Sequence, residues 1–120
     1  MALDTGLVDW VREALAPIGM VTMRRMMGGA TLYCDHTVFA ILAFDELWFK
    51  ADAESDALWD AAGADRFTYT AKDRTMVMNY RRAPADAYDD ADALREWAGL
   101  AIAASLRAPV RKPRGFRKKD

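Results

Sequence analysis

Residues 21–51 have the sequence VTMRRMMGGATLYCDHTVFAILAFDELWFKA, in which runs rich in β-branched and aromatic residues alternate with turn residues. Such runs favour β-strands. Connections this short join antiparallel strands, because a parallel crossover needs about a dozen residues. The interruptions are Gly28-Gly29, Asp35-His36 and Phe44-Asp45-Glu46. The block therefore predicts four antiparallel strands, over Val21–Met27, Ala30–Cys34, Val38–Ala43 and Leu47–Ala51.

The flanking segments add a second hairpin and three helices. The hairpin is expected over Arg66–Thr70 and Thr75–Tyr80, with Pro84 ending it. Helix starts are expected at the caps Asp4 and Asp52 and at the acidic group Asp89, Asp90 and Asp92. Residues at helical spacing, nearly all of them apolar, predict the buried faces. They are Leu7, Trp10, Val11, Ala14, Leu15 and Ile18 in the first helix, and Leu94, Trp97, Ala98, Ala101, Ile102 and Ser105 in the last.

Together these elements predict an α+β fold, with an antiparallel sheet of about six strands in two hairpin blocks and three helices packed on it. The 120 residues suit one domain, and 52% hydrophobic with 29% charged residues is ordinary globular usage. A single cysteine excludes an intrachain disulfide. No signal peptide or membrane-length apolar run is visible, so a cytoplasmic location is expected.

Charge divides the chain at residue 106. Residues 107–120 hold seven Lys/Arg and one acid, a net charge of +6, which leaves −7 on residues 1–106. We expect a single domain over 1–106 and a basic tail over 107–120 that is disordered on its own. The tail could neutralise phosphates and stack on a base. Its candidate nucleic-acid contacts are Arg111, Lys112, Arg114, Phe116, Arg117, Lys118 and Lys119.

No complete catalytic or metal-binding set is present in the sequence, and no cofactor is expected. His36 is the only histidine, and Cys34 lies two residues before it. A Cys–His pair is possible on spacing, but a turn at His36 would rotate its ring away, which favours a buried structural cysteine. Gly28-Gly29 precedes a strand rather than a helix, so it indicates a tight turn or bulge and not a phosphate loop.

Basic residues on the predicted strands form a second candidate site. Consecutive arginines on a strand point to opposite faces of the sheet. One member of each pair could therefore join the tyrosines in a patch for an anionic ligand or partner. The favoured alternative is solvated charge that pairs with Asp45, Glu46 and Asp52. The candidate contacts are Arg24, Arg25, Tyr33, Lys50, Tyr80, Arg81 and Arg82.

An ordered set of segments resembles the N-terminal domain of the TfoX/Sxy family, which is named for regulators of bacterial competence. The resemblance covers nearly all of residues 5–106. The segments are 24–29 with Leu32-Tyr33, 39–41 with 45–52, 67–69 with 78–82 and Pro84, and 94–98. This chain has Asp35-His36 where the family commonly has Asp-Gly, which predicts another turn type or a slightly strained one, because His adopts positive φ less readily than Gly.

The resemblance implies a stand-alone N-terminal domain of this family, acting as a non-enzymatic regulatory or interaction module. Such a module would act through protein contacts, as a homodimer or with a regulatory partner. The family's regulators carry a second, helical domain, whereas only the basic tail follows residue 106 here. Two alternatives stay open. One is a nucleic-acid binder that uses the tail, and the other is a small enzyme or ligand-binding domain with a pocket near Cys34 and His36 or near the arginine cluster.

Overall fold

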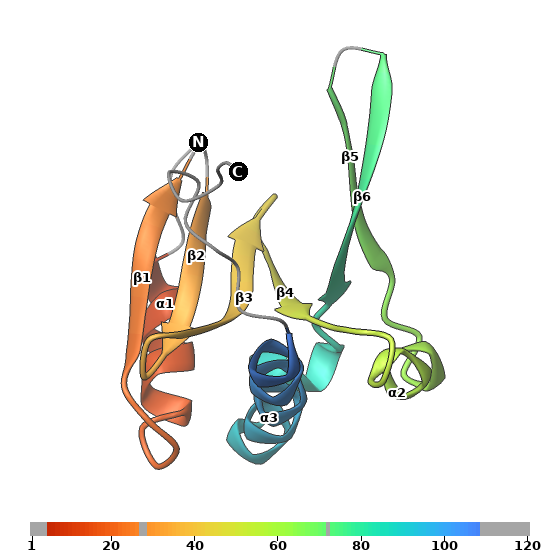
Figure 1. Cartoon of the computed structure of the whole chain (residues 1–120). Helices are drawn as coiled ribbons and strands as arrows, with labels where there is room; N and C mark the ends of the chain where they lie inside the picture. The colour runs from red at the N-terminus through yellow and green to blue at the C-terminus, as the bar shows by residue number, and fades with distance from the viewer. Residues whose placement is uncertain (1–4, 27–28, 72, 109–120) are drawn as a thin grey trace, which may run out of the picture.

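The computed structural model describes residues 5–26, 29–71 and 73–108, which form a six-stranded antiparallel sheet with helices (Figure 1). The predicted α+β fold is confirmed. The strands are β1 (Val21–Met26), β2 (Gly29–Cys34), β3 (Thr37–Ala43), β4 (Glu46–Lys50), β5 (Arg66–Ala71) and β6 (Arg74–Arg82). The helices are α1 (Thr5–Ala14), α2 (Asp56–Ala61) and α3 (Ala91–Arg107), with a short 3-10 helix η1 (Ala85–Tyr88) that was not predicted.

The strands are ordered β1-β2-β3-β4-β6-β5, which the sequence had left open. The first four strands form consecutive hairpins, and β6 then pairs with β4 through residues 80–82 alone. The rest of β6 pairs only with β5. The β5–β6 hairpin therefore projects beyond the other strands, as Figure 1 shows. β1 and β5 are the two edge strands.

Two of the hairpin turns have non-glycine residues in the left-handed region. Asp35 and His36 have φ of 48° and 72°, and Phe44 and Asp45 have φ of 55° and 63°. Two consecutive positive φ values are the sign pattern of a type I′ turn, which suits the twist of the flanking strands. His36, where a glycine is common in similar sequences, thus adopts this turn type with a strained backbone instead of changing the turn type. The strain arises because a residue with a Cβ costs free energy in the left-handed region. Phe44 carries the same strain.

Helices α1 and α3 cover one face of the sheet and enclose the main core with β1–β4. Val11 and Leu15 are fully buried as predicted, whereas Ile18 lies after the end of α1 and is 43% exposed. Asp90 caps α3 by accepting hydrogen bonds from the backbone N–H groups of Asp92 and Ala93. Ala104, rather than Ser105, completes the buried face of α3.

Helix α2 begins later than predicted. Ser55 is its N-cap residue, and Asp52 instead accepts a hydrogen bond from the Ser55 backbone N–H in the turn before it. Trp59 anchors α2, because its ring stacks on Phe49 at 5.7 Å and on Trp97 at 5.1 Å between centroids. This stack joins the helix to the sheet and to α3. Across the described ranges, no helix is both long enough and apolar enough to cross a membrane.

Candidate functional site

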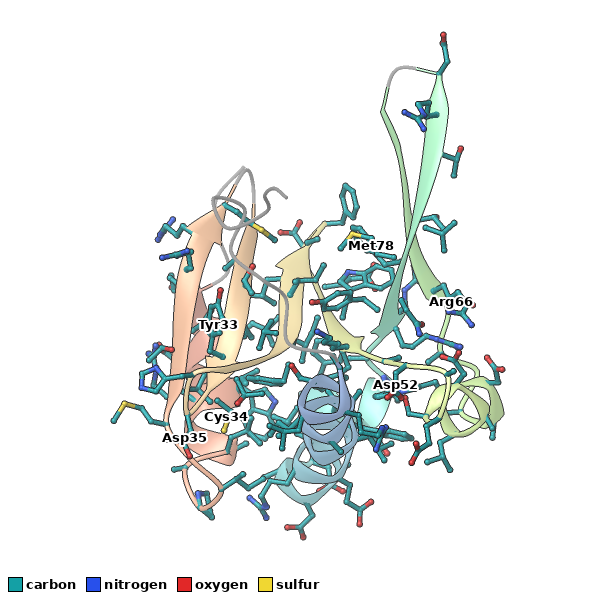
Figure 2. All side chains as sticks on the ribbon, in the orientation of Figure 1. Tyr33, Cys34, Asp35, Asp52, Arg66 and Met78 are labelled. Atoms are coloured by element: carbon teal, nitrogen blue, oxygen red, sulfur yellow. The ribbon has the colours of Figure 1, made fainter. Side chains whose placement is uncertain are left out.

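The face of the sheet opposite α1 and α3 carries most of the predicted contact residues. Directly opposed residues share a face, and β6 sets Tyr80 against Lys50, and Arg82 against Trp48. On β1 and β2, Arg24 lies opposite Thr31 and Thr22 lies opposite Tyr33. The helix-free face therefore holds five of the seven predicted residues, which are Arg24, Tyr33, Lys50, Tyr80 and Arg82. Figure 2 shows their strands and labels Tyr33.

The other two predicted residues point to the helix side, as the alternation of a strand requires. Arg25 on β1 lies opposite Ala30 of β2, and its side chain is exposed. Arg81 is only 2% exposed, and its guanidinium donates to Asp60 Oδ1 at 2.8 Å, to the Ala64 carbonyl at 2.9 Å and to Asp56 Oδ1 at 3.0 Å. The expectation of a surface contact at Arg81 is corrected by this burial. Its role is to tie α2 to the sheet.

At the β4–β6–β5 end, the helix-free face gathers apolar side chains. Ile41, Trp48 and Phe67 form a small buried cluster separate from the main core. The Phe44 ring stacks on Phe67 at 5.9 Å, and Trp48 meets Phe67 edge-on at 4.9 Å. Met78 lies opposite Phe67 on β6 (Figure 2). We call Ile41, Phe44, Trp48, Phe67 and Met78 the apolar half of this face.

Charges beside the apolar half are partnered within the fold. The Arg82 guanidinium lies over the Trp48 ring at 5.0 Å and forms ion pairs with Glu46 at 2.9 Å and with Asp65 at 3.2 Å. The favoured alternative for the basic residues, pairing with nearby acids, thus describes Arg82. A groove of about 460 Å³ runs over this region, lined by Phe44, Glu46, Trp48, Asp65, Arg66, Thr68 and Arg82.

Two other cations of the same face, Arg24 on β1 and Lys50 on β4, differ from Arg82. Within the described residues, neither Arg24 nor Lys50 has a carboxylate at ion-pair distance. A hollow of about 330 Å³ is lined by Thr22, Met23, Arg24, Tyr33 and His36. Burial raises the pKa of Tyr80, and the nearby Tyr33 raises it further, so the two phenols lie within electrostatic reach. We call Arg24, Tyr33, His36, Lys50 and Tyr80 the cationic half. It extends across the sheet from β1 to β6, where Tyr80 also packs against the cluster of Ile41, Trp48 and Phe67.

Cys34 and His36 lie on opposite sides of the sheet. The thiol of Cys34 is buried in the main core, where burial and then Asp35 raise its pKa and keep it protonated. His36 is exposed and lines the hollow on the helix-free side. The predicted rotation of His36 away from Cys34 is therefore confirmed. Among the described residues, no group of three or more His, Cys, Asp or Glu side chains could hold a metal ion.

One ion pair at the end of α3 was missed by sequence reasoning. Arg107, which had been assigned to the tail, is the last residue of α3 and donates two hydrogen bonds to Asp52, at 2.8 and 2.9 Å. The hydrogen bond from Arg107 holds the pKa of Asp52 well below its usual range. No local signal could have revealed a pair so distant in sequence. The predicted nucleic-acid contacts from Arg111 to Lys119 lie outside the described residues.

Comparison with models of known protein families gives a match over most of the chain. The family model described as the TfoX N-terminal domain matches residues 13–105, which include every strand of the sheet, α2 and nearly all of α3. A search of curated proteins finds no match. The family model covers well over half of the chain, in agreement with the ordered segments quoted from the sequence. The chain therefore belongs to the TfoX N-terminal domain family.

Proposed function

We propose that this chain is a non-enzymatic interaction module that binds a protein partner, in the first instance a second copy of itself, through the apolar half. The observation that carries the proposal is Phe44. Its ring is 62% exposed and its backbone is left-handed, yet it stands over the cluster of Trp48 and Phe67. A bulky ring in that position contributes little to the chain's own core, so we attribute it to an interface.

The charges around the apolar half support a protein partner. Arg82 is already paired with Glu46 and Asp65, and Arg66 donates to Asp56 at 3.2 Å. A partner that covered the rings would therefore leave Arg82 and Arg66 with their counterions. An apolar centre inside a rim of satisfied polar groups is the usual anatomy of a protein interface.

The projecting hairpin supports a second copy as that partner. Val77 is 60% exposed and Met78 is 38% exposed on β6, where that strand extends past β4. A two-stranded ribbon is only marginally stable alone, and an exposed edge strand pairs readily with another chain. Two copies related by a two-fold axis would bury the same patch twice. The separation of Cys34 from His36 supports the non-enzymatic part of the proposal.

Light scattering on the full chain across a micromolar concentration series tests the proposal. Phe44→Gly removes the ring and relieves the left-handed backbone, so the variant should fold and yet be monomeric. Leu58→Ala is the matched control, because Leu58 is 53% exposed on α2, away from the patch. A dimer in the parent and the control, with a monomer in Phe44→Gly, supports the proposal. A parent that is monomeric throughout contradicts self-association, and a dimeric Phe44→Gly places the interface elsewhere.

A further inference from the structure

We propose that the cationic half binds single-stranded nucleic acid, with bases stacked against Tyr33 and Tyr80 and phosphates held by Arg24 and Lys50. This goes beyond the proposed protein interaction, because it uses other residues of the helix-free face and a ligand of another class.

The charge of this surface is opposite to that of the body that carries it. The side chains that β1, β2 and β3 place on the helix-free face include no acid, although residues 1–106 have a net charge of −7. They are Thr22, Arg24, Met26, Thr31, Tyr33, Val38, Ile41 and Ala43. Arg24 is exposed and Lys50 is half-buried, and neither has an acidic partner in the part of the chain that the structure describes. A polyanion would supply the missing counterions.

Two aromatic rings give the surface a second feature that a polyanion alone does not require. Tyr33 on β2 and Tyr80 on β6 are separated by β3 and β4, so their backbones lie about 14 Å apart at the usual strand spacing. Both rings are half-buried, and neither hydroxyl has a hydrogen-bond partner among the described residues. Half-buried Val38, opposite Tyr33, adds an apolar floor. Rings held firmly beside cations are the elements that bind unpaired bases.

His36 adds an observation that points to a ligand. Its φ of 72° is costly for a residue with a Cβ, and its side chain lines the hollow beside Thr22 and Arg24. Strain of this kind is found where the side chain is used. The imidazole, the Thr22 hydroxyl and the Arg24 guanidinium together offer donors to a phosphate next to the Tyr33 ring.

The chemistry of the surface distinguishes a single strand from other anionic partners. A duplex hides the faces of its bases, so it could use the cations but not the rings. An acidic peptide would likewise leave the rings without a stacking partner. A strand with unstacked bases uses both kinds of group at once, and the sheet face is broad enough to present them side by side.

Fluorescence anisotropy of a labelled single-stranded oligonucleotide, with the full chain over a salt series, tests the proposal. Arg24→Glu and Arg25→Glu change the charge equally on neighbouring exposed residues, but only Arg24 lies on the helix-free face. Arg24→Glu should weaken binding at least about tenfold and reduce the salt dependence by about 0.7 in slope or more, since each phosphate contact contributes that much. Arg25→Glu should stay within about twofold, because Arg25 points to the other face of the sheet. Any contribution of the basic tail is common to both variants and does not affect their difference.

Tyr33→Ala should weaken binding by about fivefold to a hundredfold, the usual effect of losing one stacked base. His36→Gly should also weaken it while leaving the fold intact, since glycine accepts the left-handed backbone. Equal losses in Arg24→Glu and Arg25→Glu overturn the proposal, as does duplex of the same sequence binding as tightly as the strand. Competition by a free mononucleotide at equal concentration would assign a nucleotide pocket instead. Unchanged strand binding by Phe44→Gly separates this result from the outcome for the apolar half.

Discussion

The two halves of the helix-free face are built on the same sheet but differ in how their cations are partnered. Beside the apolar half, Arg82 lies over the Trp48 ring and forms ion pairs with the carboxylates of Glu46 and Asp65. In the cationic half, Arg24 and Lys50 have no such partner among the described residues. The comparison teaches that residue type alone does not identify a ligand-binding arginine. What matters is whether another part of the chain already supplies its counterion.

The largest expected effect on stability concerns Arg81, an arginine on the opposite, helix-covered face of the sheet. Arg81→Ala should lower the free energy of unfolding by about 3 kcal/mol, because it leaves Asp56 without its buried partner and opens a space beside Ala64. Arg82→Ala is the control on the opposite face. Its side chain is 46% exposed, so its loss should cost less than about 1 kcal/mol.

Urea unfolding of both variants at neutral pH measures the difference. Equal losses for the two variants would break the distinction between an arginine that holds the fold together and one that borders a binding surface.

A smaller effect is expected from the two left-handed turns, one in each half. His36→Gly should raise the free energy of unfolding by about 1 kcal/mol, because it removes the cost of a Cβ at positive φ. Phe44→Gly gains the same relief but loses the stacking on Phe67, worth about 0.5–1.5 kcal/mol, so its net change should be near zero.

Thermal unfolding distinguishes the two variants, since 1 kcal/mol corresponds to a Tm shift of about 4 °C in a domain of this size. His36→Ala is the control, because it removes the imidazole and keeps the strained Cβ. If it stabilises the chain as much as His36→Gly does, relief of backbone strain is not the cause.

The smallest effect concerns the ion pair that joins the end of α3 to the segment before α2. Hydrogen bonds from Arg107 hold the pKa of Asp52 below its usual range, so the folded state binds this proton less tightly than the unfolded state does. The resulting stability is complete above the ordinary aspartate pKa of about 3.9 and falls as the pH drops below it towards the folded-state pKa. Acid should therefore destabilise the parent chain.

Arg107→Ala should make this decline shallower, because Asp52 then titrates closer to its ordinary range. Urea midpoints at neutral pH and at pH values below 4 measure it, with Asp52→Asn as the reciprocal variant. Asp56 titrates in both proteins, where the hydrogen bonds from Arg66 and Arg81 outweigh its desolvation and lower its pKa. A decline of unchanged steepness in both variants would contradict the assignment to Asp52.

The local pattern of the chain was enough to predict all six strands and three helices, with boundaries that mostly lie within a few residues of those observed. It also predicted the opposite orientations of Arg24 and Arg25, and of Arg81 and Arg82. These properties depend on neighbours in the sequence, since side chains alternate along a strand and Asp90 caps the helix that follows it. The predicted start of α2 was wrong because Asp52 and Ser55 are both plausible caps by residue type, and only Ser55 occupies the N-cap position.

The partners of those side chains were decided by the tertiary structure. Insertion of β6 between β4 and β5 brings Arg81 to Asp60, which is 21 residues away, and the packing of α3 brings Arg107 to Asp52, 55 residues away. No local pattern encodes contacts of this range, because they follow from which strands pair and how helices cover them. The sequence by itself thus determined that neighbouring residues of each strand point to opposite faces, while the fold decided which face is open and which side chains on it remain available to bind.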